Sequence, residues 1–182
     1  MKKVILFFAN GTEEIEALTA VDILRRAGAE VTLAGVGGTE LCGSHGIRIT
    51  ADVAAEDALS GAYDMAVVPG GMPGTNHMDA CEAVDTVLKT TAANGGYLAA
   101  ICAAPTILAQ LGITDGKHAV CYPGCEEEMG VAEISAALPC IRDGHVITGA
   151  SAGCAIPFAL SLIETLKGTE EAQRIAKQIV IR

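Results

Sequence analysis

Short apolar segments alternate with longer amphipathic segments along most of the chain, and glycine stands at many of the junctions. A continuous apolar run of four to eight residues is typical of a strand buried on both faces of a parallel sheet. Alternation of such strands with helical segments predicts an α/β fold: a doubly wound, mainly parallel sheet with helices on both faces. Strands are expected at residues 4–9, 31–36, 63–68, 97–101, 118–122 and 145–148, and later helices at about 80–93, 103–111, 153–166 and 170–179.

The first helix is expected directly after the strand at residues 4–9. Thr12 can cap it, because a hydroxyl accepts a free backbone N–H at a helix start. Glu13 and Glu14 suit the positive end of the helix dipole, and Gly28 suits its C-terminal end. The helix would bury an apolar face made of Ile15, Leu18, Val21 and Leu24.

Charge and aromatic content restrict the partners of this chain. It has 12 Lys and Arg against 22 Asp and Glu, a net charge of -10, and only 3% aromatic residues. Such a surface repels phosphate backbones and anionic membranes, and it offers few rings for stacking on bases. We therefore expect no nucleic-acid partner and no membrane partner.

Two further features concern the organisation and compartment of the chain. No linker, repeat or low-complexity tract is visible, so residues 1–182 are predicted to form one domain. No stretch has the roughly 18 apolar residues that a membrane span needs. The run at residues 4–9 is too short for a signal peptide and is soon followed by glutamates. Seven cysteines without an export signal argue against a disulfide framework, and a cytoplasmic location is expected.

Neither a cofactor nor a metal is predicted. Residues 9–14 lack the G-x-G-x-x-G of a dinucleotide fold and the hydroxyl-rich loop of a flavodoxin, and their two glutamates would repel phosphate. Cys121 and Cys125 form a C-x₃-C pair, but no second pair at suitable spacing completes a zinc site. The histidines are scattered at positions 45, 77, 118 and 145.

Cys102 is the strongest candidate for chemistry. It stands between an apolar run and an expected helix, with small neighbours on both sides. This pattern is typical of the sharp turn that presents a nucleophile in α/β enzymes. A helix starting at Ala103 would lower the pKa of the thiol and favour the thiolate. A buried structural cysteine is the alternative.

A second candidate follows another apolar run, at Pro69, Gly70 and Gly71. Paired glycines let backbone N–H groups approach a ligand closely, so this turn could form an oxyanion hole. A tight turn that needs positive φ would require the same residues. The residues alone leave both interpretations open.

These segments together resemble the ThiJ/PfpI superfamily, and within it the branch of the parkinsonism-associated protein deglycase. The resemblance is carried by Glu-Glu-Ile-Glu at 13–16, Val-Pro-Gly-Gly at 68–71 and Ala-Ile-Cys-Ala-Ala-Pro at 100–105. It implies a flavodoxin-like fold and a homodimer. It also implies that Cys102 is the reactive cysteine and that Glu16 hydrogen-bonds it. The implied oxyanion-hole amides are those of Gly71 and Ala103, with Gly70 adjacent.

The resemblance implies two classes of function. One is a cofactor-independent glyoxalase or deglycase that acts on small dicarbonyls such as methylglyoxal, or on glycated adducts, through the cysteine thiolate and the glutamate. The alternative is a non-enzymatic redox sensor or stress-protective protein whose cysteine oxidises to a sulfinate. A thiamine-pathway role is attached to some family members, but no residue here supports that chemistry.

Three departures from the family pattern bear on the site. Tyr122, expected in the pocket, stands where close relatives carry a histidine. Ala103 stands where the protease-like branch has a histidine, and no His-x-Glu of the amidotransferase relatives is found, so peptidase and amidotransferase chemistry are disfavoured. Ala150 replaces a family arginine, which suggests an altered pocket entrance.

Overall fold

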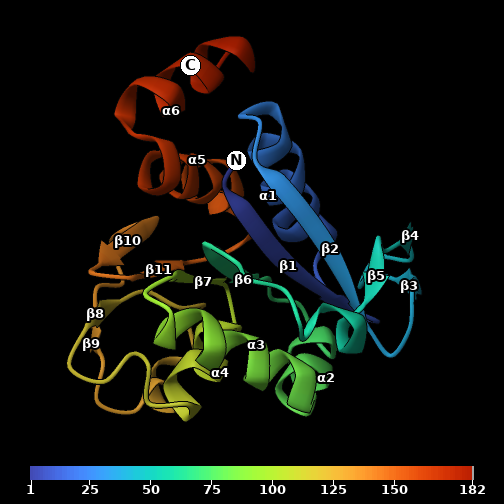
Figure 1. Ribbon diagram of the computed structural model, residues 1–182. Coiled ribbons are helices and arrows are strands. Elements are labelled where there is room, and N and C mark those ends of the chain that lie inside the picture. The colour runs from blue at the N-terminus through green and yellow to red at the C-terminus, as the bar shows by residue number, and fades with distance from the viewer. Residues whose placement is uncertain (182) are drawn as a thin grey trace.

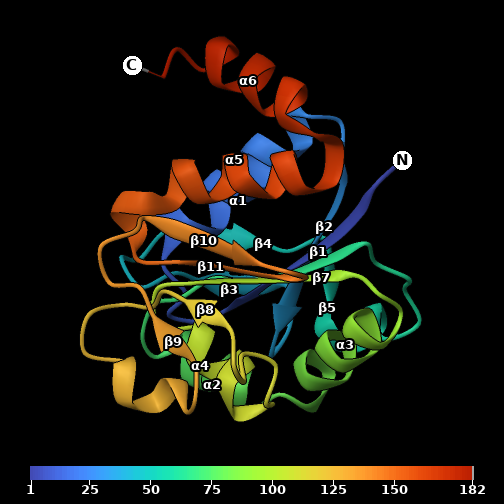
Figure 2. The same cartoon turned by 90° about the vertical axis from the view of Figure 1, so that its left-hand side faces the viewer.

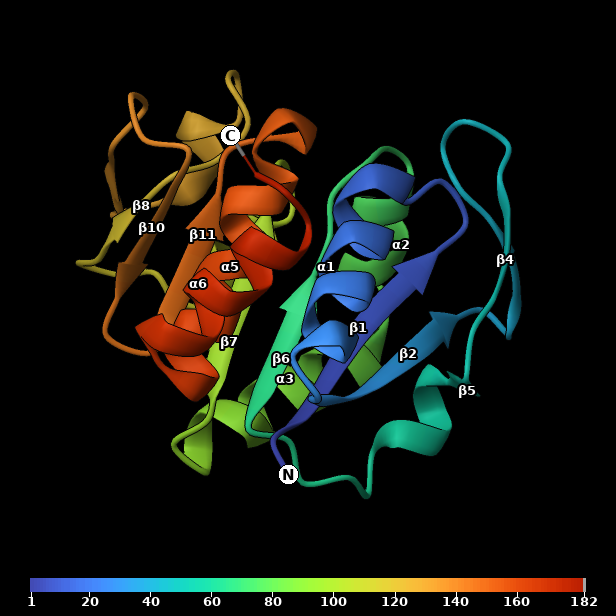
Figure 3. The same ribbon diagram turned by 90° about the horizontal axis from the view of Figure 1, so that it is seen from above.

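Seven strands form one sheet in the order β10-β11-β7-β6-β1-β2-β5, and every neighbouring pair is parallel except β10 and β11 (Figure 1, Figure 3). The computed structural model describes residues 1–181. A mainly parallel sheet is thus confirmed, with one antiparallel edge strand that the sequence did not reveal. The strands are β1 Lys3–Ala9, β2 Glu30–Val36, β5 Val53–Ala54, β6 Met65–Val68, β7 Tyr97–Ile101, β10 Cys140–Asp143 and β11 Val146–Gly149.

Helices cover both faces of the sheet, as predicted (Figure 1, Figure 2). Helices α1 and α5 lie on one face, and α6 packs on α5 farther from the sheet (Figure 2). Helices α2, α3 and α4 lie on the other face. Their bounds are α1 Glu14–Arg26, α2 Gly74–Asp79, α3 Glu82–Ala93, α4 Pro105–Gln110, α5 Ala155–Lys167 and α6 Thr169–Gln178. No helix in residues 1–181 combines the length and the apolar character that crossing a membrane requires.

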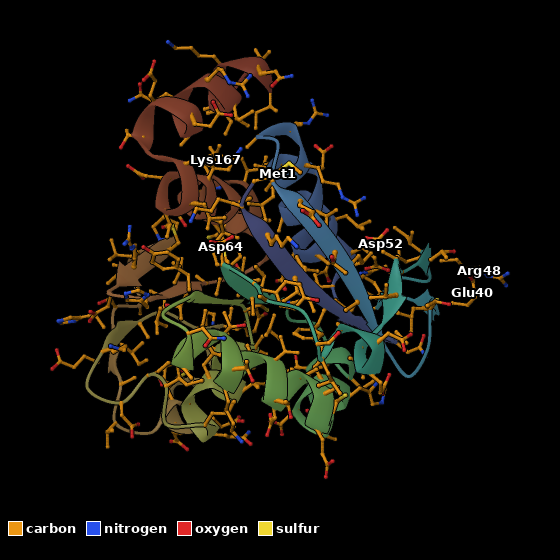
Figure 4. All side chains as sticks on the ribbon, in the orientation of Figure 1. Met1, Glu40, Arg48, Asp52, Asp64 and Lys167 are labelled. Carbon is orange, nitrogen blue, oxygen red and sulfur yellow. The ribbon has the colours of Figure 1, made fainter. Side chains whose placement is uncertain are left out.

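Strand β1 divides the interior into two cores because successive side chains of a strand point to opposite faces. Val4, Leu6 and Phe8 pack into the core beneath α1 and α5. Ile5 and Phe7 pack into the core beneath α3 and α4. At the end of α5, Lys167 donates a hydrogen bond to the carbonyl of Ala27, which joins α5 to the C-terminal end of α1 (Figure 4).

The start of α1 differs from the prediction. Thr12 is not its cap: Thr12 Oγ1 accepts the N–H of Ala9 at 3.0 Å, and Glu13 caps the helix by accepting the N–H of Ile15 at 3.4 Å. The predicted apolar face is confirmed at Val21 and Leu24, which are buried, but not at Ile15, which is 57% exposed, and Ala17 and Ala20 complete the buried face. Small residues allow the helix to approach the sheet closely.

The smaller elements are where the predictions fail most. Of residues 118–122 only β8 (His118–Ala119) is a strand, and it pairs with β9 (Glu133–Ile134) outside the main sheet. The amide that follows β8 does not pair with a strand backbone, because Val120 N donates to the side-chain oxygen Oγ1 of Thr148 at 2.9 Å. The predicted helix at 80–93 begins at Glu82, after a separate α2, and the predicted helix at 103–111 begins at Pro105.

A hairpin of β3 (Glu40–Cys42) and β4 (Arg48–Thr50) also lies outside the main sheet (Figure 1). Figure 4 shows Glu40 and Arg48 on this hairpin, on the side of the molecule far from Lys167. The loop of the hairpin returns to the start of α1, where Ser44 N donates to Thr12 O at 2.9 Å. Three short 3₁₀ turns complete the chain: η1 Ala55–Ala58, η2 Glu126–Met129 and η3 Ala152–Cys154.

Candidate active site

The carboxyl ends of three adjacent strands bring the candidate residues together. Cys102 directly follows β7, and Gly70 and Gly71 follow β6. Glu16 lies in the first turn of α1, which follows β1. Because β7, β6 and β1 are neighbours in the sheet and all parallel, their ends meet at one edge. The structure therefore places Cys102, Glu16, Gly70, Gly71 and Ala103 in one region.

Cys102 occupies a sharp turn between β7 and α4. Its φ is 67°, a left-handed conformation that is uncommon outside glycine. The surrounding backbone holds this conformation: Cys102 N donates to Gly149 O at 2.9 Å, and Tyr122 N donates to Cys102 O at 2.7 Å. Strain of this kind is found where a side chain is held in a functional orientation. The helix does not start at Ala103 as predicted, because α4 begins at Pro105.

Gly70 lies between the cysteine and the glutamate. Its N–H donates to Glu16 Oε2 at 2.8 Å, so this amide holds the carboxyl group and is not a free donor for a ligand. A Cβ at Gly70 would lie 2.7 Å from Cys102 Cβ and 2.9 Å from Glu16 Oε2. Gly70 is thus required for close approach, whereas Gly71 has a φ of +93° that favours glycine. The positive φ of Gly71 fits the tight-turn interpretation, the Gly70 amide is taken by Glu16, and the oxyanion hole stays a prediction for the amides of Gly71 and Ala103.

The side chain of Glu16 is fully buried beside the sulfur. Its Oε1 has no hydrogen bond of regular geometry to the residues that the structure describes. The carboxyl group is nevertheless close enough to Cys102 for each group to shift the pKa of the other. The carboxyl group of Glu16 is therefore placed to exchange a proton with the thiol.

The cysteine and the glutamate form a coupled pair. Burial and the charge of Glu16 raise the pKa of the Cys102 thiol to about 12, although the amides of Ala103 and Gly71 act in the opposite direction. Burial also raises the pKa of Glu16 to about 7, against the hydrogen bonds from Cys102 and Gly70. The predicted lowering of the thiol pKa is therefore wrong while Glu16 is ionised. Two such close negative charges are unfavourable, so the pair retains one proton near neutral pH.

The sequence of the chain matches the model of the DJ-1/PfpI family over residues 2–165. The chain belongs to this family. Protein dj-1beta of Drosophila melanogaster is 38% identical over 99% of this chain and 97% of its own length. Its crystal structure has a TM-score of 0.95 at 36% identity, covering 100% of this chain and 98% of that one. The resemblance and the flavodoxin-like α/β fold it implied are confirmed.

Two other DJ-1/PfpI relatives bear on function through their names. Glutathione-independent glyoxalase DJR-1.2 of Caenorhabditis elegans is 33% identical over 97% of this chain and 95% of its own length. The structure of Toxoplasma gondii DJ-1 in an oxidized form has a TM-score of 0.94 at 36% identity, covering 99% of this chain and 98% of that one. These names describe those two proteins.

The environment of this DJ-1/PfpI site contains residues that sequence reasoning missed. Gly149 holds the backbone of Cys102, and the glycine that ends an apolar run at β11 was its only signal. Glu13 raises the pKa of Glu16 through its charge. Tyr122, which the sequence had placed in the pocket, donates its backbone N–H to Cys102 O, and the residue is 48% exposed.

Surface pockets of about 540 and 360 Å³ lie at α6 and between α5 and α6, away from Cys102. Their position follows from the way α6 stands off the sheet (Figure 2). The second pocket is lined by Cys140 and Glu164, but Cys140 lacks the backbone amides that act on the sulfur of Cys102, so we assign the chemistry to Cys102 and Glu16.

Proposed function

We propose that this protein is a cofactor-independent glyoxalase or deglycase-type enzyme that acts on small dicarbonyls such as methylglyoxal, or on glycated adducts. The observation that carries the proposal is the set of groups around one sulfur: a buried carboxyl group that retains a proton near neutral pH, and two backbone amides. A relative named as a glutathione-independent glyoxalase supports the reaction class.

In the proposed reaction, Glu16 holds the proton of the pair and Cys102 attacks the aldehyde carbon as a thiolate. The carbonyl electrons move to oxygen, and the amides of Gly71 and Ala103 stabilise the resulting oxyanion. Donors of this kind contribute roughly 3 kcal/mol each to a transition state. After protonation of that oxygen by Glu16, the product of this step is a hemithioacetal, and Glu16 is left as a carboxylate.

The carboxylate of Glu16 then acts as a base. It takes the proton from the former aldehyde carbon and passes it to the neighbouring carbonyl oxygen, which gives an enediol. It then takes the hydroxyl proton of the former aldehyde carbon and delivers it to the neighbouring carbon. The result is a thioester of the 2-hydroxy acid on Cys102. Water hydrolyses this thioester, releases lactate from methylglyoxal and regenerates the thiol. Oxidation of one carbon balances reduction of the other, so the cycle needs no external oxidant or cofactor.

The decisive experiment follows methylglyoxal loss and lactate formation together. Cys102→Ser should abolish both, because a serine hydroxyl is a far weaker nucleophile, and Glu16→Ala should slow them at least about a hundredfold, within the range of general acid–base effects. Cys42→Ser is the matched control, since Cys42 is an exposed thiol outside the site. Full activity of Cys102→Ser would reject the proposal.

A redox-sensing role is the second candidate. It is favoured by the partial exposure of Cys102 and by amides that could hold sulfinate oxygens, and a relative has been crystallised in an oxidized form. Mass spectrometry after mild peroxide treatment distinguishes the roles. Gain of two oxygen atoms at Cys102 alone, in a protein that does not turn over methylglyoxal, would favour the sensor.

We also propose that the protein is a cytoplasmic homodimer. The family resemblance supports the dimer, and seven free cysteines, which suit a reducing compartment, support the location. Sedimentation equilibrium of the purified protein tests the first point. A mass of one chain at micromolar concentration would contradict it.

A further inference from the structure

Donor atoms of four side chains converge where the start of α1 meets the loop between β3 and β4. His45 Nδ1 lies 3.0 Å from Glu14 Oε2 and 3.4 Å from Glu13 Oε2. Ser44 Oγ lies 3.2 Å from each of these oxygens and 3.0 Å from the same nitrogen. The atoms come from two segments about 30 residues apart, and the ligand atoms of Glu13, Glu14 and His45 all lie within 4.8 Å of one another.

This spacing matches the ligand shell of a small tetrahedral ion. Ligands held about 2.0–2.1 Å from Zn²⁺ are about 3.3–3.4 Å apart in a tetrahedron. We propose that Glu13, Glu14 and His45 bind a divalent first-row transition ion of the Zn²⁺ type. Ser44 Oγ marks the fourth corner of the shell.

The surrounding structure orients the carboxylate of Glu14. Its Oε1 accepts the backbone N–H groups of His45 at 2.8 Å and Ile47 at 3.3 Å, which leaves Oε2 directed at the cluster. A Cβ at Gly43 would lie 2.2 Å from Glu14 Oε1, so only glycine lets the loop pass this close. Hydrogen bonds that fix a ligand from outside are typical of metal sites.

The charges of the cluster independently favour a cation. Glu14 is only 3% exposed, and a second carboxylate lies beside it. Among residues 1–181, the one side chain that forms an ion pair with either glutamate is His45, which carries at most a single positive charge. Buried charges in proteins are paired or coordinate metal ions. One divalent ion would balance both carboxylates.

The donor types select the ion. Ca²⁺ takes six to eight oxygen ligands at longer distances, and Mg²⁺ keeps an octahedral shell rich in water. An imidazole nitrogen combined with carboxylates suits Zn²⁺ and its neighbours. The ligand atoms differ from those of the proposed reaction: the carboxyl group of Glu16 faces Gly70 and Cys102, whereas those of Glu13 and Glu14 face the loop. The two sites are linked by the charge of Glu13, which raises the pKa of Glu16.

Isothermal titration of the metal-free full chain with Zn²⁺ tests this site. A Cys102→Ser background prevents the active-site thiol from competing for the ion. We expect one Zn²⁺ per chain, and at least a tenfold loss of affinity in His45→Ala and in Glu13→Gln. His118→Ala is the matched control, since His118 lies at β8, outside the cluster. Glu14 is left unchanged because its buried carboxylate also holds the loop.

Two results would overturn the proposal. One is the absence of Zn²⁺ binding by the Cys102→Ser protein, and the other is unchanged affinity in both His45→Ala and Glu13→Gln. Substitution with Co²⁺ provides a second measurement: tetrahedral bands without a thiolate charge-transfer band support the site, and a thiolate band assigns the ion to a cysteine instead. Methylglyoxal turnover is not measured, so failure here does not affect the proposed function.

Discussion

Glu16 and Cys102 illustrate at the scale of single residues how two ordinary side chains acquire unusual proton affinities. Burial raises the pKa of both groups, and the negative charge of Glu16 raises the pKa of Cys102 further, whereas the hydrogen bond from Cys102 lowers the pKa of Glu16. The amides of Ala103 and Gly71 favour the thiolate, but they do not outweigh burial together with an ionised Glu16. A proton on Glu16 is therefore the condition for a reactive sulfur.

Replacing Glu16 by Gln should lower the pKa of Cys102 below its value of about 12, because the substitution removes the neighbouring charge while burial remains. The rate of alkylation by iodoacetamide, followed at Cys102 by mass spectrometry over a range of pH, measures this change. Cys42 in the same chain is the internal reference for an exposed thiol. An unchanged pH profile at Cys102 would show that Glu16 does not control the thiol.

Gly70→Ala should disrupt the pair without changing either of its members. The added methyl group would lie 2.7 Å from Cys102 Cβ and 2.9 Å from Glu16 Oε2, so one of the two groups must move. We expect at least a tenfold loss of methylglyoxal turnover and a fall of about 1–3 kcal/mol in unfolding free energy. In the control Gly153→Ala the nearest atom is 3.8 Å from the new carbon. Wild-type turnover in Gly70→Ala would contradict the close approach.

The position of Cys102 could be predicted because its signal is local: small residues flank it between a strand and a helix. The contact of Gly70 with Glu16 joins residues 54 positions apart, and that of His45 with Glu14 joins residues 31 apart. Spacing along the chain carries no information on such contacts, which is why no metal was expected. The motif placed Gly70 near the site, but only the structure shows that its amide serves the carboxyl group.

At the scale of whole elements, long segments followed their patterns and short ones did not. The strands β1, β6 and β7 are continuous apolar runs, and most of their residues are buried. A run of this kind can be recognised as a buried strand from its composition alone. A two-residue strand such as β8 exists only through its partner β9, and nothing in its own sequence specifies that partner. Helix α1 was located correctly, and Val21 and Leu24 are buried as predicted, but the alanines of its buried face were missed because alanine counts weakly in an apolar pattern.

Helix α6 is held mainly by two buried residues, Ala172 and Ile175, which belong to the core beneath α5. Ile175→Ala should therefore lower the free energy of unfolding by about 2–4 kcal/mol, the usual cost of such a deletion in a core. Urea denaturation measures the global change, and hydrogen exchange over Thr169–Gln178 reports the helix itself. Ile181→Ala is the control, because Ile181 is 45% exposed. Equal stability of the two variants would mean that α6 contributes little.

The whole molecule places its site where the strand order reverses direction. From β1 the chain goes first to β2 on one side, and then to β6, β7 and β11 on the other. Crevices outside the strand ends at such a point are the usual ligand sites of open α/β sheets. The sequence predicted the alternation of strands and helices but not the order of the strands in the sheet. The buried strands have similar apolar compositions, so the sequence pattern does not show which strands are neighbours. The single domain over residues 1–182 stays a prediction.

Global stability should fall as the pH rises from about 4.5 to about 7. In the folded protein burial raises the pKa of Glu16 to about 7, against 4.5 for an ordinary glutamate. The folded state therefore binds this proton more tightly, and its contribution is complete below pH 4.5 and lost through pH 7. The shift corresponds to on the order of 3 kcal/mol.

Urea unfolding of the wild type and of Glu16→Gln at about pH 5 and about pH 8 isolates this contribution, because glutamine does not titrate. The wild type should lose more stability than the variant between the two conditions. An equal loss of unfolding free energy in the two proteins would show that Glu16 is not the group with the raised pKa.

The two borders of the sheet have a consequence for the behaviour of concentrated solutions. At one border β5 has only two residues, and at the other the four-residue β10 runs against its neighbour. A long, unprotected border strand is a template on which further polypeptides can polymerise. This architecture offers no such template on either flank, so the folded chain resists fibre growth even though half of its residues are apolar.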